Sequence, residues 1–198
     1  LERVAEVLGI AAGHAISVMP VLFDGIWDPD PRPGPQRAPR PGVHNSTWLQ
    51  GPGATIVADR TRWPTLRPYV DAVLARFGRD PRVVAWDLFN EPDSPNPAYA
   101  RRDPAHKREL VAALLEQVWD WAEAADPDQP LTVGVYEFPH RRAERASRVA
   151  RTAIERRNDA MHAEKAALDV SGGIRRREER TGEAADDAVC CNAQRRSP

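Results

Sequence analysis

The chain has 198 residues, enough for one domain with a sizeable hydrophobic core. Its formal net charge of -1 at pH 7 argues against a general attraction to nucleic acid or to membranes, and no apolar run is long enough to cross a bilayer. The only two cysteines, Cys190 and Cys191, are adjacent, which excludes a disulfide framework. No cluster of His, Cys and Asp has metal-ligand spacing, so neither a metal nor an organic cofactor is expected.

The N-terminus carries charges from Glu2 onward, where a signal peptide would be apolar. The cytoplasm is therefore the default location, and the missing initiator Met suggests that upstream sequence is absent. Residues 1–13 have the apolar spacing of an amphipathic helix. Residues 16–23 follow as a buried strand, which Pro20 should disturb because proline has no N–H to donate. Asp24 and Trp27 come directly after that strand.

A long excursion rich in Pro and Gly occupies residues 29–62. Loops of this length are usually functional or disordered. Within it, His44, Asn45 and Trp48 combine hydrogen-bonding groups with an indole ring, a mixture that suits a polyhydroxylated ligand. The alternative is structural, because His44 could simply pin the loop to itself.

The spacing of apolar residues predicts a helix over 64–77, followed by a strand that starts at Val83 and ends with Asn90, Glu91 and Pro92. Proline cannot extend the strand, so Glu91 should lie at its C-terminal end. In parallel α/β folds that end is where ligands bind, and a carboxylic acid there can act as a general acid. The alternative is a surface Glu in a loop.

A third helix should begin with Asp103 as N-cap and Pro104 as first helical residue, and a third strand should cover residues 131–136. Helices and strands thus alternate along the chain. Alternation of this kind predicts an α/β fold with parallel βαβ units.

The composition changes near Glu137, because all six tryptophans precede it and the following residues are rich in Arg and Ala. We therefore expect one domain over 1–137 and a tail over 138–198, with a helix at about 141–168 and disorder beyond it. The Arg clusters alternate with acids and lack aromatic neighbours, so solvated surface is a better explanation for them than nucleic-acid binding.

Three stretches together resemble glycoside hydrolase clan A, and family 5-like cellulase and xylanase enzymes in particular. They read WDLFNEPD at residues 86–93, VLFDGIWDP at 21–29 and PGVHNSTW at 41–48. The resemblance covers residues 1 to about 136. It implies a partial (β/α)8 TIM barrel, running from the second helix to the fifth strand and holding about strands 3 to 5 with their helices.

The same resemblance implies a retaining hydrolase that cleaves O-glycosyl bonds of β-linked glycans, with an oligosaccharide or β-glycoside as substrate. Glu91 would be the general acid/base, and Asn90 would hydrogen-bond the sugar 2-hydroxyl. The sugar subsites would be lined by Asp24, Trp27, His44, Asn45 and Trp48.

The chain also departs from the family. The nucleophilic carboxylate expected at the end of the seventh strand has no counterpart in the sequence, and Glu137 is the only neighbouring acid that could replace it. We interpret the chain as a truncated product, with a frameshift near residues 136–140, and expect impaired or no turnover. A non-catalytic carbohydrate-binding remnant is the alternative function, and an Arg-rich adaptor acting through residues 141–198 is a third.

Overall fold

The computed structural model describes residues 1–32, 34–136, 152, 154–160 and 162–163. The chain divides into two units, Leu1–Ile154 and Glu155–Pro198, and the architecture below belongs to the first. Glu137 and most of the tail lie outside the described residues, including most of the helix expected at about 141–168 and the whole segment after it. Residues 154–160 are helical.

Two parallel strands form the centre of the first unit: β1 (Trp86–Asn90) and β2 (Leu131–Gly134). The predicted parallel pairing is confirmed, although β1 starts three residues later than Val83. Residues 86–89 are all buried, as expected of a parallel strand whose two faces are both covered. The side chain of Trp86 anchors the start of β1 by donating to Gln129 Oε1 at 3.0 Å.

The predicted strand at 16–23 runs parallel to β1 on the side away from β2, but it is not continuous. It pairs only through the isolated bridges Val18–Val83, Val21–Asp87 and Asp24–Asn90. The pairing slips by one residue at Pro20, which cannot donate to the ladder and whose carbonyl accepts from the Asp87 N–H at 3.0 Å. The three parallel runs therefore lie side by side in the order in which the chain makes them.

Four helical segments lead into β1: α1 (Glu2–Gly13), α2 (Ala54–Ala58), the 3-10 helix η1 (Arg60–Leu66) and α3 (Arg67–Phe77). The expected start of a helix at Pro64 is wrong, because Pro64 lies inside η1. The long excursion also ends earlier than predicted, since α2 and η1 occupy its last part. Helix α3 buries Val70, Val73, Leu74 and Phe77, the i, i+3, i+4, i+7 face that the periodicity predicts.

Helix α4 (Lys107–Ala124) connects β1 to β2 and buries an apolar face that includes Leu114, Leu115 and Val118. The prediction of Asp103 as its N-cap and Pro104 as its first residue is wrong. The helix begins at Lys107, after His106 in a left-handed conformation. The Asp103 carboxylate is instead engaged by the Lys107 ammonium at 3.1 Å and by the Gln50 amide at 3.2 Å.

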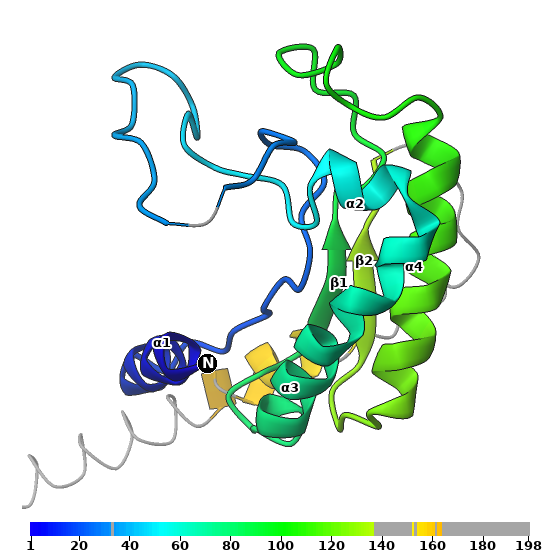
Figure 1. Cartoon of the computed structure of the whole chain (residues 1–198). Helices are drawn as coiled ribbons and strands as arrows, with labels where there is room; N and C mark the ends of the chain where they lie inside the picture. The colour runs from blue at the N-terminus through cyan, green and yellow to red at the C-terminus, as the bar shows by residue number, and fades with distance from the viewer. Residues whose placement is uncertain (33, 137–151, 153, 161, 164–198) are drawn as a thin grey trace, which may run out of the picture. The chain divides into compact units, whose positions relative to one another are not determined.

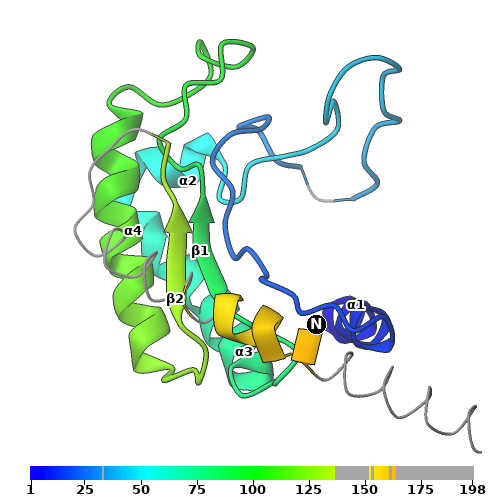
Figure 2. The same ribbon diagram turned by 180° about the vertical axis from the view of Figure 1, so that it is seen from behind.

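The helices α2 and α4 lie on one face of the β1–β2 sheet, as the two opposite views show (Figures 1 and 2). The main core lies between these helices and the sheet. Its cluster of buried side chains includes Trp86, Leu88, Phe89, Val111 and Val133. The loops that follow the extended run and β1 lie at the C-terminal end of the strands (Figure 1). Asp24, Asn90 and Glu91, which the sequence analysis nominates as site residues, lie at that end of the sheet. None of the helices in the described part of the chain is both long and apolar enough to span a bilayer.

Candidate functional site

Polar residues from separate parts of the chain meet where the parallel runs end. Asp24 ends the extended run, Asn90 ends β1, and Gly134 ends β2. The Asn90 amide donates to Asp24 Oδ2 at 2.9 Å, and Asp24 Oδ1 accepts from the Ile26 N–H at 3.1 Å. The structure thus brings together two of the predicted site residues, and their contact fixes the orientation of the Asn90 side chain.

Glu91 directly follows β1 at its C-terminal end, as predicted, and is half-buried. Its backbone is left-handed (φ 43°), its N–H donates to the Gly134 carbonyl at 2.6 Å, and its carbonyl accepts from the Ser94 N–H at 3.2 Å. A non-glycine residue in this conformation is uncommon, and strained backbone of this kind clusters at functional sites. Within the described part of the chain, the Glu91 carboxylate makes no hydrogen bond or ion pair, so it is available to a ligand.

Gly25 holds the loop after the extended run tightly against the turn after β1. Its N–H donates to the Asn90 carbonyl at 2.9 Å. A Cβ at this position would lie 2.6 Å from Pro92 Cα and 2.8 Å from the Glu91 carbonyl oxygen. Only glycine allows this approach, because the obstructing atoms are backbone.

Replacing Gly25 with Ala should therefore push the Glu91–Pro92 turn away and lower the free energy of unfolding by about 1–3 kcal/mol, the usual cost of overpacking. Urea unfolding followed by tryptophan fluorescence measures this loss. Gly13→Ala is the matched control, because a Cβ there meets nothing within 4 Å. Equal stability of the two variants would show that the turn yields without cost.

Asp87 is a buried carboxyl that the sequence analysis did not nominate. Between the pairs Asp87–Thr132 and Asn90–Gly134, β1 contains one residue more than β2, which is a bulge in the ladder. Asp87 Oδ1 accepts from the Phe89 N–H at 3.0 Å, inside this bulge. Its carboxylate thus satisfies backbone donors that the irregular ladder leaves unpaired.

Burial raises the pKa of Asp87 to about 6, against the opposing effect of the Phe89 and Gly134 N–H groups, and the nearby Asp24 carboxylate raises it further. The only feature of the sequence that pointed to Asp87 was the presence of an acidic residue in an otherwise apolar strand. A lone buried acid next to a strand's end would have been worth nominating.

An aromatic cluster lies in the loops that follow Asp24. Trp27 meets Trp48 edge-on at 5.4 Å between ring centroids and His44 at 5.7 Å. Trp48 is 54% exposed, and His44 is exposed too. The indole N–H of Trp27 is buried and has no hydrogen-bond partner among the described residues. The expected set of Trp27, His44 and Trp48 is therefore assembled by the fold.

Asn45, the remaining predicted binding residue, has a positive φ of 48°, and its carbonyl accepts from the Trp48 N–H at 3.0 Å. Its visible role is to make the turn that carries Trp48. No group of three or more His, Cys, Asp or Glu in the described ranges is arranged to hold a metal ion.

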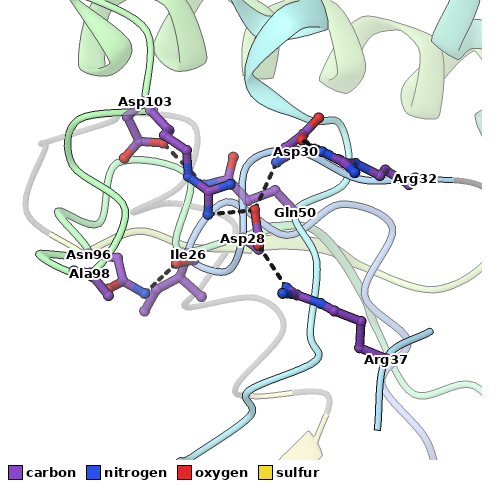
Figure 3. A network of polar contacts seen from close by, with 10 residues as sticks. Ile26, Asp28, Asp30, Arg32, Arg37, Gln50, Asn96, Ala98 and Asp103 are labelled. Atoms are coloured by element: carbon purple, nitrogen blue, oxygen red, sulfur yellow. Dashed lines mark hydrogen bonds and ion pairs between the residues drawn. The ribbon is translucent and has the colours of Figure 1, made fainter. Parts of the chain in front are cut away.

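Next to the aromatic cluster, the Asp28 carboxylate is buried and serves as the centre of a polar network (Figure 3). It forms an ion pair with Arg102 at 2.9 Å and accepts from Arg37 at 3.3 Å and from the Asp30 N–H at 3.2 Å. Asp30 in turn pairs with Arg32 at 2.8 Å. The network joins the long excursion to the loop that precedes α4.

Comparison with known proteins adds no family to this picture. No family model matches the chain. No curated protein matches its sequence.

Proposed function

We propose that this chain carries the acid/base part of a retaining glycoside hydrolase site for β-linked glycans. The observation that supports the proposal is the position of Asn90 and Glu91 at the C-terminal end of β1, the middle one of three parallel runs. Consecutive strands that are also neighbours in space are what a (β/α)8 barrel requires, and such barrels hold their active sites at this end.

In this proposal Glu91 protonates the glycosidic oxygen as the leaving group departs and then deprotonates the incoming water. Asn90, held by Asp24, hydrogen-bonds the sugar 2-hydroxyl, a contact that strengthens in the oxocarbenium-like transition state. The exposed face of Trp48 stacks on a sugar ring, and Trp27 and His44 support it. Asn45 shapes this subsite through its turn.

A retaining mechanism also needs a nucleophilic carboxylate about 5–5.5 Å from the acid. The described residues contain no strand corresponding to the one that bears it in the enzymes that the sequence resembles. Glu137, the remote substitute, lies outside the described residues. We therefore expect weak or no hydrolysis by this chain alone. An external nucleophile such as azide should restore cleavage of aryl β-glycosides, which is the test of the proposed function.

Carbohydrate binding without cleavage is a second candidate function, and the exposed Trp48, packed edge-on against Trp27, favours it. An exposed aromatic face suits a sugar ring, and the exposed His44 imidazole of the same cluster supplies a hydrogen-bonding group. Carbohydrate binding without cleavage requires no nucleophilic carboxylate.

Replacing Trp48 with Ala should weaken the binding of cellotetraose or xylotetraose about tenfold, because the stacking platform is lost. Isothermal titration calorimetry gives the dissociation constants. Val43→Ala is the control, since Val43 is an exposed apolar residue of the same loop. Unchanged affinity in the Trp48 variant would exclude this platform as the binding surface.

A further inference from the structure

A separate cavity of about 230 Å³ opens beside the aromatic cluster. It does not include Asp24, Asn90 or Glu91, so it is distinct from the end of the sheet. Ligand pockets for drug-sized molecules are usually about 300–1,000 Å³, so this cavity suits a single small unit. Its lining is formed by Asp28, Asp30, Arg32, Pro35, Gln36, Arg37, Leu49 and Arg102.

The charge of this lining is unbalanced. Three guanidinium groups face two carboxylates, which leaves one positive charge in excess. The Asp28 carboxylate is the buried centre, and its side chain is 9% exposed. Arg37, whose side chain is 65% exposed, reaches it from the long excursion (Figure 3). Arg102, whose side chain is 47% exposed, reaches it from the loop that precedes α4.

These arginines have donors to spare. Each guanidinium carries five N–H groups, and the ion pair with Asp28 engages only part of them. A planar guanidinium pairs best with a carboxylate or a phosphate, through two parallel hydrogen bonds. Asp28 therefore acts as an anchor that gathers the arginines, while their remaining donors can serve an anion from outside.

Two residues of the cavity lining are the chain neighbours of the two tryptophans of the aromatic cluster. Asp28 follows Trp27 and Leu49 follows Trp48, and the two pairs are joined where the Asp28 N–H donates to the Trp48 carbonyl at 3.3 Å. A sugar chain stacked on Trp48 could thus place its next unit in the cavity. Leu49 and Pro35 supply apolar contacts for the carbon side of that unit.

We propose that this cavity is a subsite for an acidic sugar, in which the arginines bind the carboxylate of a uronic acid unit of the glycan. The inference rests on the proposed carbohydrate function and specifies its substrate class. The excess positive charge, the guanidinium donors and the position beside Trp48 together favour an anionic sugar over a neutral one.

The test compares two disaccharides that differ only in a carboxylate: cellobiouronic acid and cellobiose. Calorimetric titration of the full chain at low salt should show cellobiouronic acid binding at least about tenfold more tightly. Raising the salt concentration should narrow the difference, because Arg37 and Arg102 are partly exposed. Arg37→Gln and Arg102→Gln should each reduce the preference severalfold.

Arg101→Gln is the matched control, since Arg101 is exposed and does not line the cavity. Arg32→Gln is the second cavity variant. It removes only an exposed ion pair, with Arg32 83% exposed, so it should fold normally and still weaken the preference.

Equal affinity for the two disaccharides, or no binding of either, would overturn the proposal. So would a preference that survives in all three cavity variants. Inorganic phosphate forms the last arm: if it competes as well as cellobiouronic acid, the cavity binds small anions and the assignment to sugar is wrong. None of these binding measurements needs turnover. A failure of azide-dependent cleavage would therefore count against the hydrolase proposal without deciding whether the cavity binds a uronic acid.

Discussion

With azide present, the wild-type chain should release the aglycone from aryl β-glycosides, and Glu91→Gln should slow that release by about 100-fold or more when the leaving group is a poor one. A general acid contributes about 10²–10⁴-fold to such a step, and glutamine cannot give up a proton. Azide takes the place of the nucleophilic carboxylate, so the product should be a glycosyl azide of inverted configuration. Mass spectrometry and a colorimetric assay measure product and rate.

The dependence on the leaving group provides the control. A dinitrophenolate leaves without a proton, so Glu91→Gln should have little effect on dinitrophenyl glycosides. Glu6→Gln is the matched variant, because Glu6 is an exposed acid on α1. If Glu91→Gln slows good and poor leaving groups equally, Glu91 positions the substrate and does not donate the proton. If no glycoside is cleaved with azide, the hydrolase proposal is wrong.

Wild-type protein should lose about 2 kcal/mol of stability relative to Asp87→Asn as the pH rises from about 4 to about 6.5. The pKa of Asp87 is about 6 in the folded state, because burial disfavours its charge, and an unfolded aspartate has a pKa of about 3.9. Asp87 therefore stabilises the fold fully below the unfolded pKa, and this contribution disappears as the pH rises through the folded one. Urea unfolding at several pH values measures both proteins.

The wild type must be compared with Asp87→Asn because the ionisation of other carboxylates changes the stability in the opposite direction as the pH rises. The hydrogen bond from Arg82 lowers the pKa of Asp80, so Asp80 adds stability as the pH rises. That contribution is common to both proteins and cancels in the difference. Parallel stability curves for the wild type and Asp87→Asn would contradict a buried, hard-to-ionise Asp87.

Apolar periodicity predicted the helices at the centre of this fold well. The buried face of α3, from Val70 to Phe77, is the one that the spacing indicates, and so is that of α4. Helix ends were predicted less well, because they depend on side chains from elsewhere. Asp103 has the residue type of an N-cap, but its carboxylate bonds Gln50 from a loop 53 positions away.

The strand at 16–23 shows the same limit. Its composition predicted an extended run, and the proline rule predicted a disturbance at Pro20. The composition could not indicate that the run would pair through only a few bridges and slip by one residue against β1. That slip depends on which β1 N–H groups meet the Pro20 carbonyl, and such pairing is decided by the neighbouring strand.

By itself, the sequence determined that a strand ends at Asn90 and Glu91, since Pro92 forbids its continuation whatever surrounds it. Only the tertiary structure decided which groups meet there. Asp24 and Asn90 are 66 residues apart, and their contact exists because two parallel runs pair in one register. Local steric rules can be read from neighbours along the chain, whereas the burial that raises the pKa of Asp87 arises only once distant segments have packed around it.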